Sequence, residues 1–405
     1  MKTRDEIQQE AISLIENNNT VILELATGIG KSACAIKAIN NLQGITPIPL
    51  RVLLLVAEVA HINNWKAEFA KWELTDKIDI TIECYASLKK YRNTTWDIAI
   101  FDEIHHINSE LRIDLFKSLK INKLIGLSAT VTAEVYNGIK YIRKDYKTLK
   151  VTLKDAIEWG VLPKPKLYLI PLVLDNYRKT ESILEEWGSK HKRIVINTTL
   201  QDRWKYIKDK TKYPNITLHI ECTQKEKYDH ITQQFEYWKK RYMQMNQDFA
   251  KNKWLLLGSE RKRFLGECKT KYLQRLLNTL EGKRFICFCS SIKQAEKLHA
   301  TNCIHSKKKD VTKIIESFNN KEIDNIFAIG MLQEGQNLID IDAGIIAQLD
   351  GVERAFTQKF GRTLRAEDPE QYVFYYKDTR DEGFLQKILN TINEEYVQTL
   401  NINEI

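Results

Sequence analysis

The feature that most constrains the fold is an alternation of short apolar runs with helical patterns, which occurs twice along the chain. Short, mostly apolar runs of four or five residues are typical of parallel strands that are buried on both faces. In the first part they predict strands at 21–25, 52–56, 98–101 and 124–127, with helices at 32–41 and 61–72. After Gly282 they predict strands at 285–289, 326–329, 345–349 and 372–376, with helices at 292–300 and 355–363. We therefore expect an α/β protein with two parallel sheets in tandem.

Two prolines mark the predicted end of the first α/β domain. Pro163 and Pro165 stand two residues apart, and prolines favour an extended chain over a helix. The expected domains are 1–162, a connector at 163–224 that can include the first strand of the second domain, a basic helical hairpin at 225–281, and 282–405 with a C-terminal helix. Residues 176–215 show no pattern that assigns them a structure.

The hairpin is predicted from an apolar stripe and a charge excess. Apolar residues recur at steps of three and four from Tyr228 through Phe235 to Phe249, which predicts one long helix, and Gly258 is expected to end it. Residues 225–275 hold thirteen Lys/Arg against six Asp/Glu. If the stripe is used in packing the two helices, the cations remain outside and can meet phosphates. The residues predicted to bind nucleic acid are Lys239, Lys240 and Arg241; a solvated helix face is the alternative.

Composition restricts the class of protein. The net charge of +9 suits a polyanionic partner. The chain has no run of eighteen apolar residues, and its first residues lack the apolar core of a signal peptide, so we expect a soluble, cytoplasmic protein without a membrane segment. The seven cysteines show no paired spacing typical of a zinc site and are expected to be reduced.

A phosphate-binding loop is predicted where the first strand ends. The segment 26–32, Ala-Thr-Gly-Ile-Gly-Lys-Ser, joins an apolar strand to a helix. Backbone amides at small residues and the helix N-terminus bind phosphates, so Thr27, Gly28 and Gly30 are expected to surround them. Lys31 would reach the β and γ phosphates of ATP, and Ser32 would be a ligand of Mg²⁺. The first glycine of the general pattern is absent, since Leu25 stands there.

Two carboxylates follow the predicted strand at 98–101. Ligands of open α/β sheets bind at the carboxyl ends of the strands, which is where Asp102 and Glu103 stand. Asp102 is expected to hold hydrated Mg²⁺, and Glu103 to orient and polarise the attacking water. His105 is expected to couple the site to movement.

With these motifs in this order, the chain resembles the superfamily 2 helicases and translocases of the DExH type over residues 4–135 and 283–378. The resemblance implies two RecA-like domains with ATP between them. It further implies that Gln8 reads the adenine base. The segment Ser128-Ala129-Thr130 matches the motif that links ATP hydrolysis to domain movement, with Ser128 and Thr130 in the coupling role.

The second half carries the remaining family motifs. Residues 358–365, Gln-Lys-Phe-Gly-Arg-Thr-Leu-Arg, match the pattern Gln-x-x-Gly-Arg-x-x-Arg. This match implies that Gln358 contacts ATP and that Arg365 is the arginine finger with Arg362 beside it. Gly335 and Asn337 lie in Glu-Gly-Gln-Asn-Leu, which resembles the form found in Swi/Snf-type DNA translocases. The first nucleic-acid motif departs from the family pattern, because Ala57-Glu58 replaces its Pro-Thr or Pro-Leu.

These features together predict a monomeric ATP-dependent DNA helicase or translocase that uses ATP and Mg²⁺. DNA is favoured over RNA by the Asp-Glu-Ile-His box and by Asn337. An RNA helicase is the nearest alternative. The other is an ATP-switch motor subunit that works with a protein partner in a restriction or phage replication complex. We predict no second catalytic centre and at most one short helix beyond Asp378.

Overall fold

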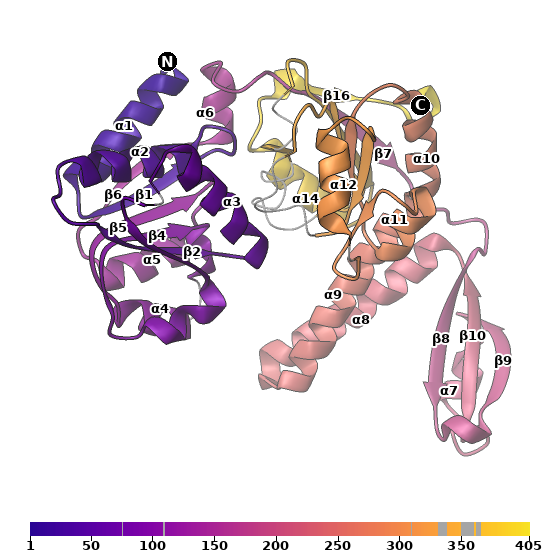
Figure 1. Ribbon diagram of the computed structural model, residues 1–405. Coiled ribbons are helices and arrows are strands. Elements are labelled where there is room, and N and C mark those ends of the chain that lie inside the picture. Colours follow the sequence, from indigo (N-terminus) through magenta and orange to yellow (C-terminus); the bar gives the residue numbers. More distant parts are fainter. Residues whose placement is uncertain (75, 108–109, 309, 331–337, 350–359, 362–365) are drawn as a thin grey trace.

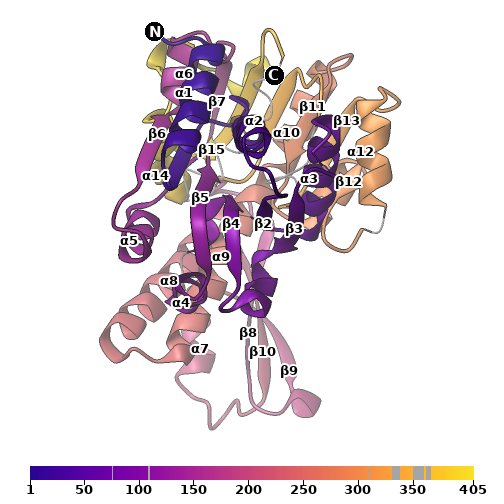
Figure 2. The same ribbon diagram turned by 60° about the vertical axis from the view of Figure 1, so that its left-hand side comes forward.

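Two parallel sheets lie side by side, and a smaller sheet and a helical hairpin project from the same side of the second one (Figure 1, Figure 2). The computed structural model describes residues 1–74, 76–107, 110–308, 310–330, 338–349, 360–361 and 366–405. Within these residues, no helix combines the length and the apolar character needed to cross a membrane.

The first sheet has the strand order β3-β2-β4-β5-β1-β6, and all neighbouring strands are parallel. Its strands are β1 (Thr20–Leu25), β2 (Arg51–Val56), β3 (Asp79–Cys84), β4 (Thr95–Asp102), β5 (Lys120–Ser128) and β6 (Lys147–Val151). The four strands predicted from apolar runs are all present. The two strands that were not predicted, β3 and β6, are the edges of the sheet. No residue of β3 is fully buried and only Leu149 and Val151 of β6 are buried, so neither strand forms an apolar run.

Helices connect these strands. They are α1 (Arg4–Asn17), α2 (Lys31–Gly44), α3 (Val59–Lys71), α4 (Glu110–Lys117), α5 (Ala133–Ile142) and α6 (Leu153–Glu158), with the 3₁₀ turns η1 (Tyr85–Tyr91) and η2 (Ile104–His106). The start of α1 is fixed by a capping box, in which the Thr3 hydroxyl accepts from the Glu6 amide and the Glu6 carboxylate accepts from the Thr3 amide. The cap fixes where this helix begins, and α1 carries Gln8.

The second sheet has the order β12-β13-β11-β14-β15-β7-β16 and is parallel throughout. Its strands are β7 (Lys166–Leu172), β11 (Phe285–Phe288), β12 (Cys303–Ile304), β13 (Asn325–Ala328), β14 (Ala343–Ile346), β15 (Glu370–Tyr376) and β16 (Val397–Thr399). Its helices are α10 (Thr270–Thr279), α11 (Ile292–Leu298), α12 (Val311–Asn319) and α14 (Arg380–Leu389). The helix predicted at 355–363 lies almost wholly outside the described residues.

The C-terminal tail contains more than the single short helix that the sequence predicts. After α14 come the 3₁₀ turn η4 (Glu394–Tyr396), the strand β16, which pairs with β7, and the turn η5 (Ile402–Glu404). The prediction of at most one helix is wrong because β16 is three residues long and mostly exposed, too short to show an apolar run.

Residues 176–222 contain a separate small sheet that the sequence left unassigned. It has the order β8-β10-β9, with β8 (Glu181–Trp187) antiparallel and β9 (Ile194–Thr199) parallel to β10 (Ile216–Cys222). The short helix α7 (Trp204–Ile207) and the turn η3 (Lys190–Lys192) lie in its connections. Its own apolar core consists of Ile183, Ile216, Leu218, Ile220 and Cys222.

The helical hairpin consists of α8 (Gln224–Met245) and α9 (Asp248–Cys268), but the predicted break at Gly258 is wrong. The chain turns instead at Asn246, which adopts the left-handed conformation with φ 48°. Gly258 is inside α9, where an added Cβ would lie 3.2 Å from Phe235 Cε2 of α8. This glycine therefore marks a close approach of the two helices.

The apolar stripe of the hairpin contacts α9 well beyond its base, since the Phe235 and Tyr242 rings lie 6.1 and 5.7 Å from the Trp254 ring, but it is buried only near the base. Tyr228 and Ile231 are buried, whereas Met245 and Phe249 at the turn are 53% and 62% exposed. The expectation that all cations remain outside is also wrong for two residues. The Arg261 guanidinium is buried and lies 4.1 Å from the Phe235 ring centroid, and Lys269 is fully buried, where its Nζ pairs with Asp381 Oδ2 at 2.7 Å. The apolar stripe correctly predicted the helix α8, but it did not predict how much of α8 is covered by α9.

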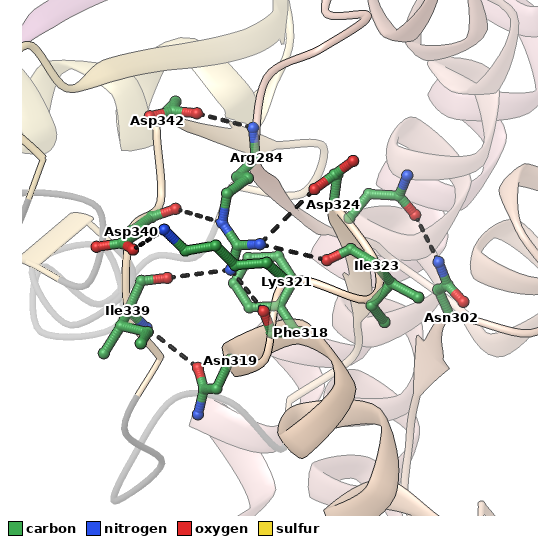
Figure 3. Close-up of polar contacts among 11 residues, drawn as sticks. Arg284, Asn302, Phe318, Asn319, Lys321, Ile323, Asp324, Ile339, Asp340 and Asp342 are labelled. Carbon is green, nitrogen blue, oxygen red and sulfur yellow. Dashed lines mark hydrogen bonds and ion pairs between the residues drawn. The ribbon is translucent and has the colours of Figure 1, made fainter.

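Arg284 fixes the connections around β11 (Figure 3). Its guanidinium donates to the backbone oxygens of Phe318 (2.6 Å) and Asp340 (2.9 Å), and its backbone N–H donates to Asp342 Oδ2 at 2.8 Å. The side chain is buried and lies 4.1 Å from the Phe318 ring centroid. The end of α12 and the segment that enters β14 are thereby held together.

Candidate ATP site

The predicted site segments of the first half meet at one edge of the first sheet. β4, β5 and β1 are neighbours in that order and are parallel. The carboxyl ends of parallel strands share an edge, so the segments that follow them come together there. These segments are 26–32 after β1, 103–106 after β4 and 129–130 after β5.

The segment 26–32 forms a tight loop that leads into α2. Gly28 and Gly30 have φ of 98° and 104°, a conformation that only glycine adopts readily. Lys31 begins α2, and its Nζ donates to the backbone oxygen of Leu25 at 2.9 Å. Burial lowers the pKa of Lys31, and the nearby Glu103 and Asp102 carboxylates oppose this effect. The Lys31 ammonium group thus lies over the 26–32 loop, where it can neutralise the charge of a bound phosphate.

Gln8 reaches this loop from α1. Its Nε2 donates to the backbone oxygen of Ile29 at 2.8 Å, and a Cβ added to Gly30 would lie 2.7 Å from the same nitrogen. Gln8 therefore helps to hold the loop in its shape. Its predicted contact with adenine stays a prediction.

Asp102 ends β4 and is held by two aromatic residues. Trp65 Nε1 of α3 donates to Asp102 Oδ2 at 2.8 Å, and the Tyr85 hydroxyl donates to the Asp102 backbone oxygen at 2.8 Å. Burial, followed by the negative charge of Glu103, raises the pKa of Asp102 to about 6, against the opposing effect of the Trp65 hydrogen bond. An ionised Asp102 is therefore costly unless a cation is near.

Glu103, His105 and Ser128 form a triangle of polar contacts. The Ser128 hydroxyl lies 3.0 Å from Glu103 Oε2 and 2.9 Å from the backbone oxygen of Thr130. His105 Nδ1 lies 3.1 Å from both Glu103 Oε2 and Ser128 Oγ. Glu103 adopts the left-handed conformation with φ 50°, a strained backbone that is frequent at functional sites. The three residues, predicted from two separate motifs, are thus brought together.

The oxygen donors at this edge suit Mg²⁺. Ser32 follows Lys31 at the start of α2, and Asp102 stands across the edge at the end of β4. A hydroxyl and a carboxylate are ligands of the kind Mg²⁺ accepts, and phosphate oxygens and water usually complete its coordination. Ser32 and Asp102 could therefore hold the ion when a nucleotide is bound.

A segment of the second half reaches the phosphate loop. A Cβ added to Gly361 would lie 2.7 Å from Thr27 Cβ, so the Gly361 backbone lies directly against the Thr27 side chain. Phe360 beside it is fully buried. Gly361 is in the predicted ATP-contacting motif. The motif residues Gln358, Arg362 and Arg365, and also Gly335 and Asn337, lie outside the described residues.

The residues predicted to bind nucleic acid lie on the distal half of α8. Lys239 Nζ is 4.0 Å from Glu236 Oε2, and Arg241 donates to the Tyr237 hydroxyl at 3.0 Å. Lys240 is exposed. None of these contacts buries the charges, so the positions agree with the predicted role without testing it.

Sequence reasoning missed Glu24, whose carboxylate supports the coupling motif. It is buried in β1, accepts from the Val131 backbone amide at 3.2 Å and from the Tyr136 hydroxyl at 2.7 Å, and pairs with Lys150 at 3.1 Å. The sequence signal that could have identified Glu24 is its position as a charged residue within the apolar run 21–25. Such a residue is rarely buried unless it is paired.

Two family descriptions match the chain. Residues 1–133 match "Type III restriction enzyme, res subunit", and residues 268–367 match "Helicase conserved C-terminal domain". The first match covers the phosphate loop and both carboxylates, and the second covers the segment with Gly361.

Relatives of known description include a translocase and a viral protein. The DNA 3'-5' translocase XPB2 of Sulfurisphaera tokodaii is 23% identical over 391 residues, which cover 90% of this chain and 79% of that protein. "Putative helicase 161L" of Invertebrate iridescent virus 6 is 24% identical over 213 residues, which cover 49% of this chain. The match spans only 41% of the viral protein's length.

Solved structures share the two-sheet arrangement. S. cerevisiae Dbp5 bound to RNA and ADP BeF3 matches with a TM-score of 0.60 at 12% identity, and the match covers 98% of this chain and 90% of that chain. At this identity the likeness shows the fold alone, and it confirms two RecA-like domains in tandem. The two family matches and the relative XPB2 identify the chain as a superfamily 2 helicase, a nucleic-acid-dependent ATPase.

Proposed function

We propose that this protein is an ATP-dependent DNA translocase or helicase that hydrolyses ATP between the two parallel-sheet regions. The observation that carries the proposal is the close approach of Gly361 to Thr27, because it brings the second region against the phosphate loop of the first. A nucleotide bound to that loop would contact both regions and could control their separation.

In this proposal the first region binds the phosphates and the metal. The amides of Thr27, Gly28 and Gly30 surround the phosphates, and Lys31 neutralises their charge. Ser32 and Asp102 hold Mg²⁺, which offsets negative charge on the phosphates when it is bound. Gln8 reads the adenine.

Hydrolysis itself is assigned to Glu103, which accepts a proton from the attacking water. His105 and Ser128 hold its carboxylate at 3.1 and 3.0 Å, and Ser128 also contacts the Thr130 backbone. A shift of Thr130 would therefore move the general base, which gives a route from domain movement to chemistry. From the second region, Arg365 is assigned to stabilising charge in the transition state, and Arg362 and Gln358 are assigned to contacts with ATP. Gly335 and Asn337 are assigned to coupling.

We propose that the nucleic acid is DNA. A relative whose match covers 90% of this chain is named a DNA translocase, and the Asp-Glu-Ile-His box and Asn337 favour the same substrate. The proposed domains remain 1–162, 163–224, 225–281 and 282–405, in a protein that acts as a monomer. The hairpin residues Lys239, Lys240 and Arg241 are assigned to the DNA backbone.

The test is the rate of ATP hydrolysis with duplex DNA, single-stranded DNA and RNA, each at saturation, with Glu103→Gln as the background control. We expect DNA to stimulate the wild-type protein most. Stimulation by RNA alone would overturn the choice of DNA. Turnover that needs an added protein partner, with bare nucleic acid inactive, would support the ATP-switch subunit instead.

A further inference from the structure

The small sheet ends in a compact basic tip at its distal end. Glu181 of β8 pairs with Cys222 of β10, so the connections to β7 and α8 leave from that end of the sheet. Trp187, Ile194 and Ile216 are register partners at the opposite end. The two loops there, 188–193 and 208–215, are called the basic tip below. It points away from both parallel sheets (Figure 1).

The two loops of the basic tip are locked together. Trp187 Nε1 donates to the Tyr213 backbone oxygen at 2.7 Å, and the Ser189 amide donates to Asn215 Oδ1 at 2.6 Å. Gly188 has φ 75°, and a Cβ there would lie 2.1 Å from the Pro214 backbone oxygen. The loops thus form one defined surface, and a larger residue at Gly188 would separate them.

The basic tip carries a concentrated positive charge. Its two loops contain six Lys/Arg against one Asp, and both loops are described in full. Within them the ion pairs involve only Arg193, which contacts Glu186 at 2.6 Å. Asp209 accepts from the Lys212 amide at 3.0 Å within its own loop. The exposed lysines are Lys190, Lys192, Lys208, Lys210 and Lys212.

The chemistry of this surface fits a phosphate backbone rather than bases. Lys210 Nζ lies 5.6 Å from the Trp187 ring centroid and Lys212 Nζ lies 5.6 Å from the Tyr213 ring centroid, so cations lie over both rings. Lysines are flexible point charges that bind phosphates without reading sequence. Duplex DNA has the denser line of phosphates and is the better match to clustered lysines.

We propose that the basic tip is a second contact for the backbone of duplex nucleic acid, separate from the hairpin. This inference rests on the proposed function. The small sheet and the hairpin project from the same side of the second parallel-sheet region in both views, so one duplex can meet both (Figure 1, Figure 2). Their relative position is fixed at the base by Lys227, which pairs with Glu181 at 3.0 Å.

The test replaces Lys190, Lys192 and Lys210 together with Gln. The matched control replaces Lys120, Lys144 and Lys147 with Gln, which removes the same charge from the amino-terminal edge of the first sheet, where β5 and β6 begin. A second triple variant replaces the three tip lysines with Arg and retains the charge. Melting temperatures show whether each variant folds. The readout is the salt dependence of duplex binding.

Each lost phosphate contact flattens the plot of log K against log salt by about 0.9, so the Gln variant should lose roughly two to three units of slope. Its affinity for duplex should fall about tenfold or more near 0.1 M salt. The duplex concentration that half-saturates ATP hydrolysis should rise, with kcat at saturating duplex retained. The Arg variant should keep the wild-type slope, and the control should change little.

An unchanged slope in a folded Gln variant would overturn the inference. It would favour an acidic protein segment instead, since Ile194 and Val195 beside the tip are 68% and 67% exposed. The inference would also be overturned if the Gln variant and the control variant lost the same amount of slope, because the loss of net charge alone would then explain the weaker binding. The wild-type protein distinguishes a failure of this inference from a failure of the proposed function. If the proposed function is wrong, nucleic acid will not stimulate ATP hydrolysis by the wild-type protein. If only this inference is wrong, that stimulation will remain.

Discussion

The ATP-site edge of the first sheet and the insertion, which comprises the small sheet and the hairpin at 176–268, differ in what determines their structure. At the edge, the site residues follow buried strands whose order fixes which segments meet, and short polar contacts hold them. In the insertion, exposed cations lie on a hairpin and a small sheet that contact the rest of the protein mainly at their bases. The ATP-site edge holds its reactive groups in fixed positions, as catalysis requires. The insertion presents a charged surface that suits a long, charged partner. Variants of the two regions should therefore fail in different ways.

The largest effect is expected at Glu103. Glu103→Gln should retain ATP binding and lose turnover by about 10³-fold or more, because the amide cannot accept the proton of water. Lys31→Ala should instead weaken ATP binding, since it removes the cation of the phosphate loop. Both variants should keep the salt dependence of DNA binding. Equilibrium nucleotide binding and steady-state hydrolysis separate the two outcomes, and wild-type turnover in Glu103→Gln would contradict the assignment.

Arg365 tests whether the second region completes the same site. Arg365→Ala should lower turnover by about 10³-fold, as the loss of an arginine finger does elsewhere, with DNA binding retained. Arg362→Ala is the matched control and should have the smaller effect. Single-turnover hydrolysis at saturating ATP measures both. A loss below about tenfold for Arg365→Ala would transfer the role to Arg362.

The ATP edge could be predicted because its signals are local in sequence. Apolar runs give the central strands. Asp102 and Ser128 are the last residues of β4 and β5, and Lys31 begins the helix that follows β1. The parallel order of β4, β5 and β1 then brings their carboxyl ends together. The contacts of Trp65 with Asp102 and of Glu24 with Val131 could not be predicted, because they join side chains that are distant in sequence.

The insertion was harder to predict because its strands are only partly buried. β9 exposes Ile194 and Val195, and β8 alternates without a clear apolar face, so neither gives a strand pattern. The hairpin helices were predicted from their stripe, but the position of the turn was not. Glycine weakens a helix, so the sequence predicts a break at Gly258. In the structure this glycine instead allows α9 to pack closely against Phe235 of α8.

The hairpin cations should affect binding rather than turnover. Replacing Lys239, Lys240 and Arg241 with Gln should flatten the salt dependence of DNA binding by about two units and lower affinity without regard to sequence. The Lys120, Lys144 and Lys147 triple variant is again the charge-matched control. Filter binding at several salt concentrations gives the slope. If the slope stays at its wild-type value, these charges serve solubility or a protein partner, and the DNA path lies elsewhere.

The smallest expected effect is a gain in the stability of the folded protein when the negative charge of Asp102 is removed. The folded pKa of Asp102, about 6, is above the ordinary value of 3.8, so the folded state binds the proton more tightly than the unfolded state does. Its contribution to stability is therefore greatest below about pH 4 and is lost as pH rises towards 6. Above pH 6, the folded protein holds an ionised carboxylate that burial and the negative charge of Glu103 disfavour, which lowers its stability.

Asp102→Asn should therefore raise the melting temperature of the nucleotide-free protein at pH 7.5 and abolish turnover. The amide oxygen can still accept from Trp65 Nε1, so the shape of the site is retained. The gain should shrink at pH 5, where the wild-type carboxyl is largely protonated. Asp97→Asn is the control, a carboxylate at the amino-terminal end of the same strand. Equal stability of wild type and Asp102→Asn at pH 7.5 would show that the carboxylate carries no cost there, and that the first sheet is not strained by its own catalytic charge.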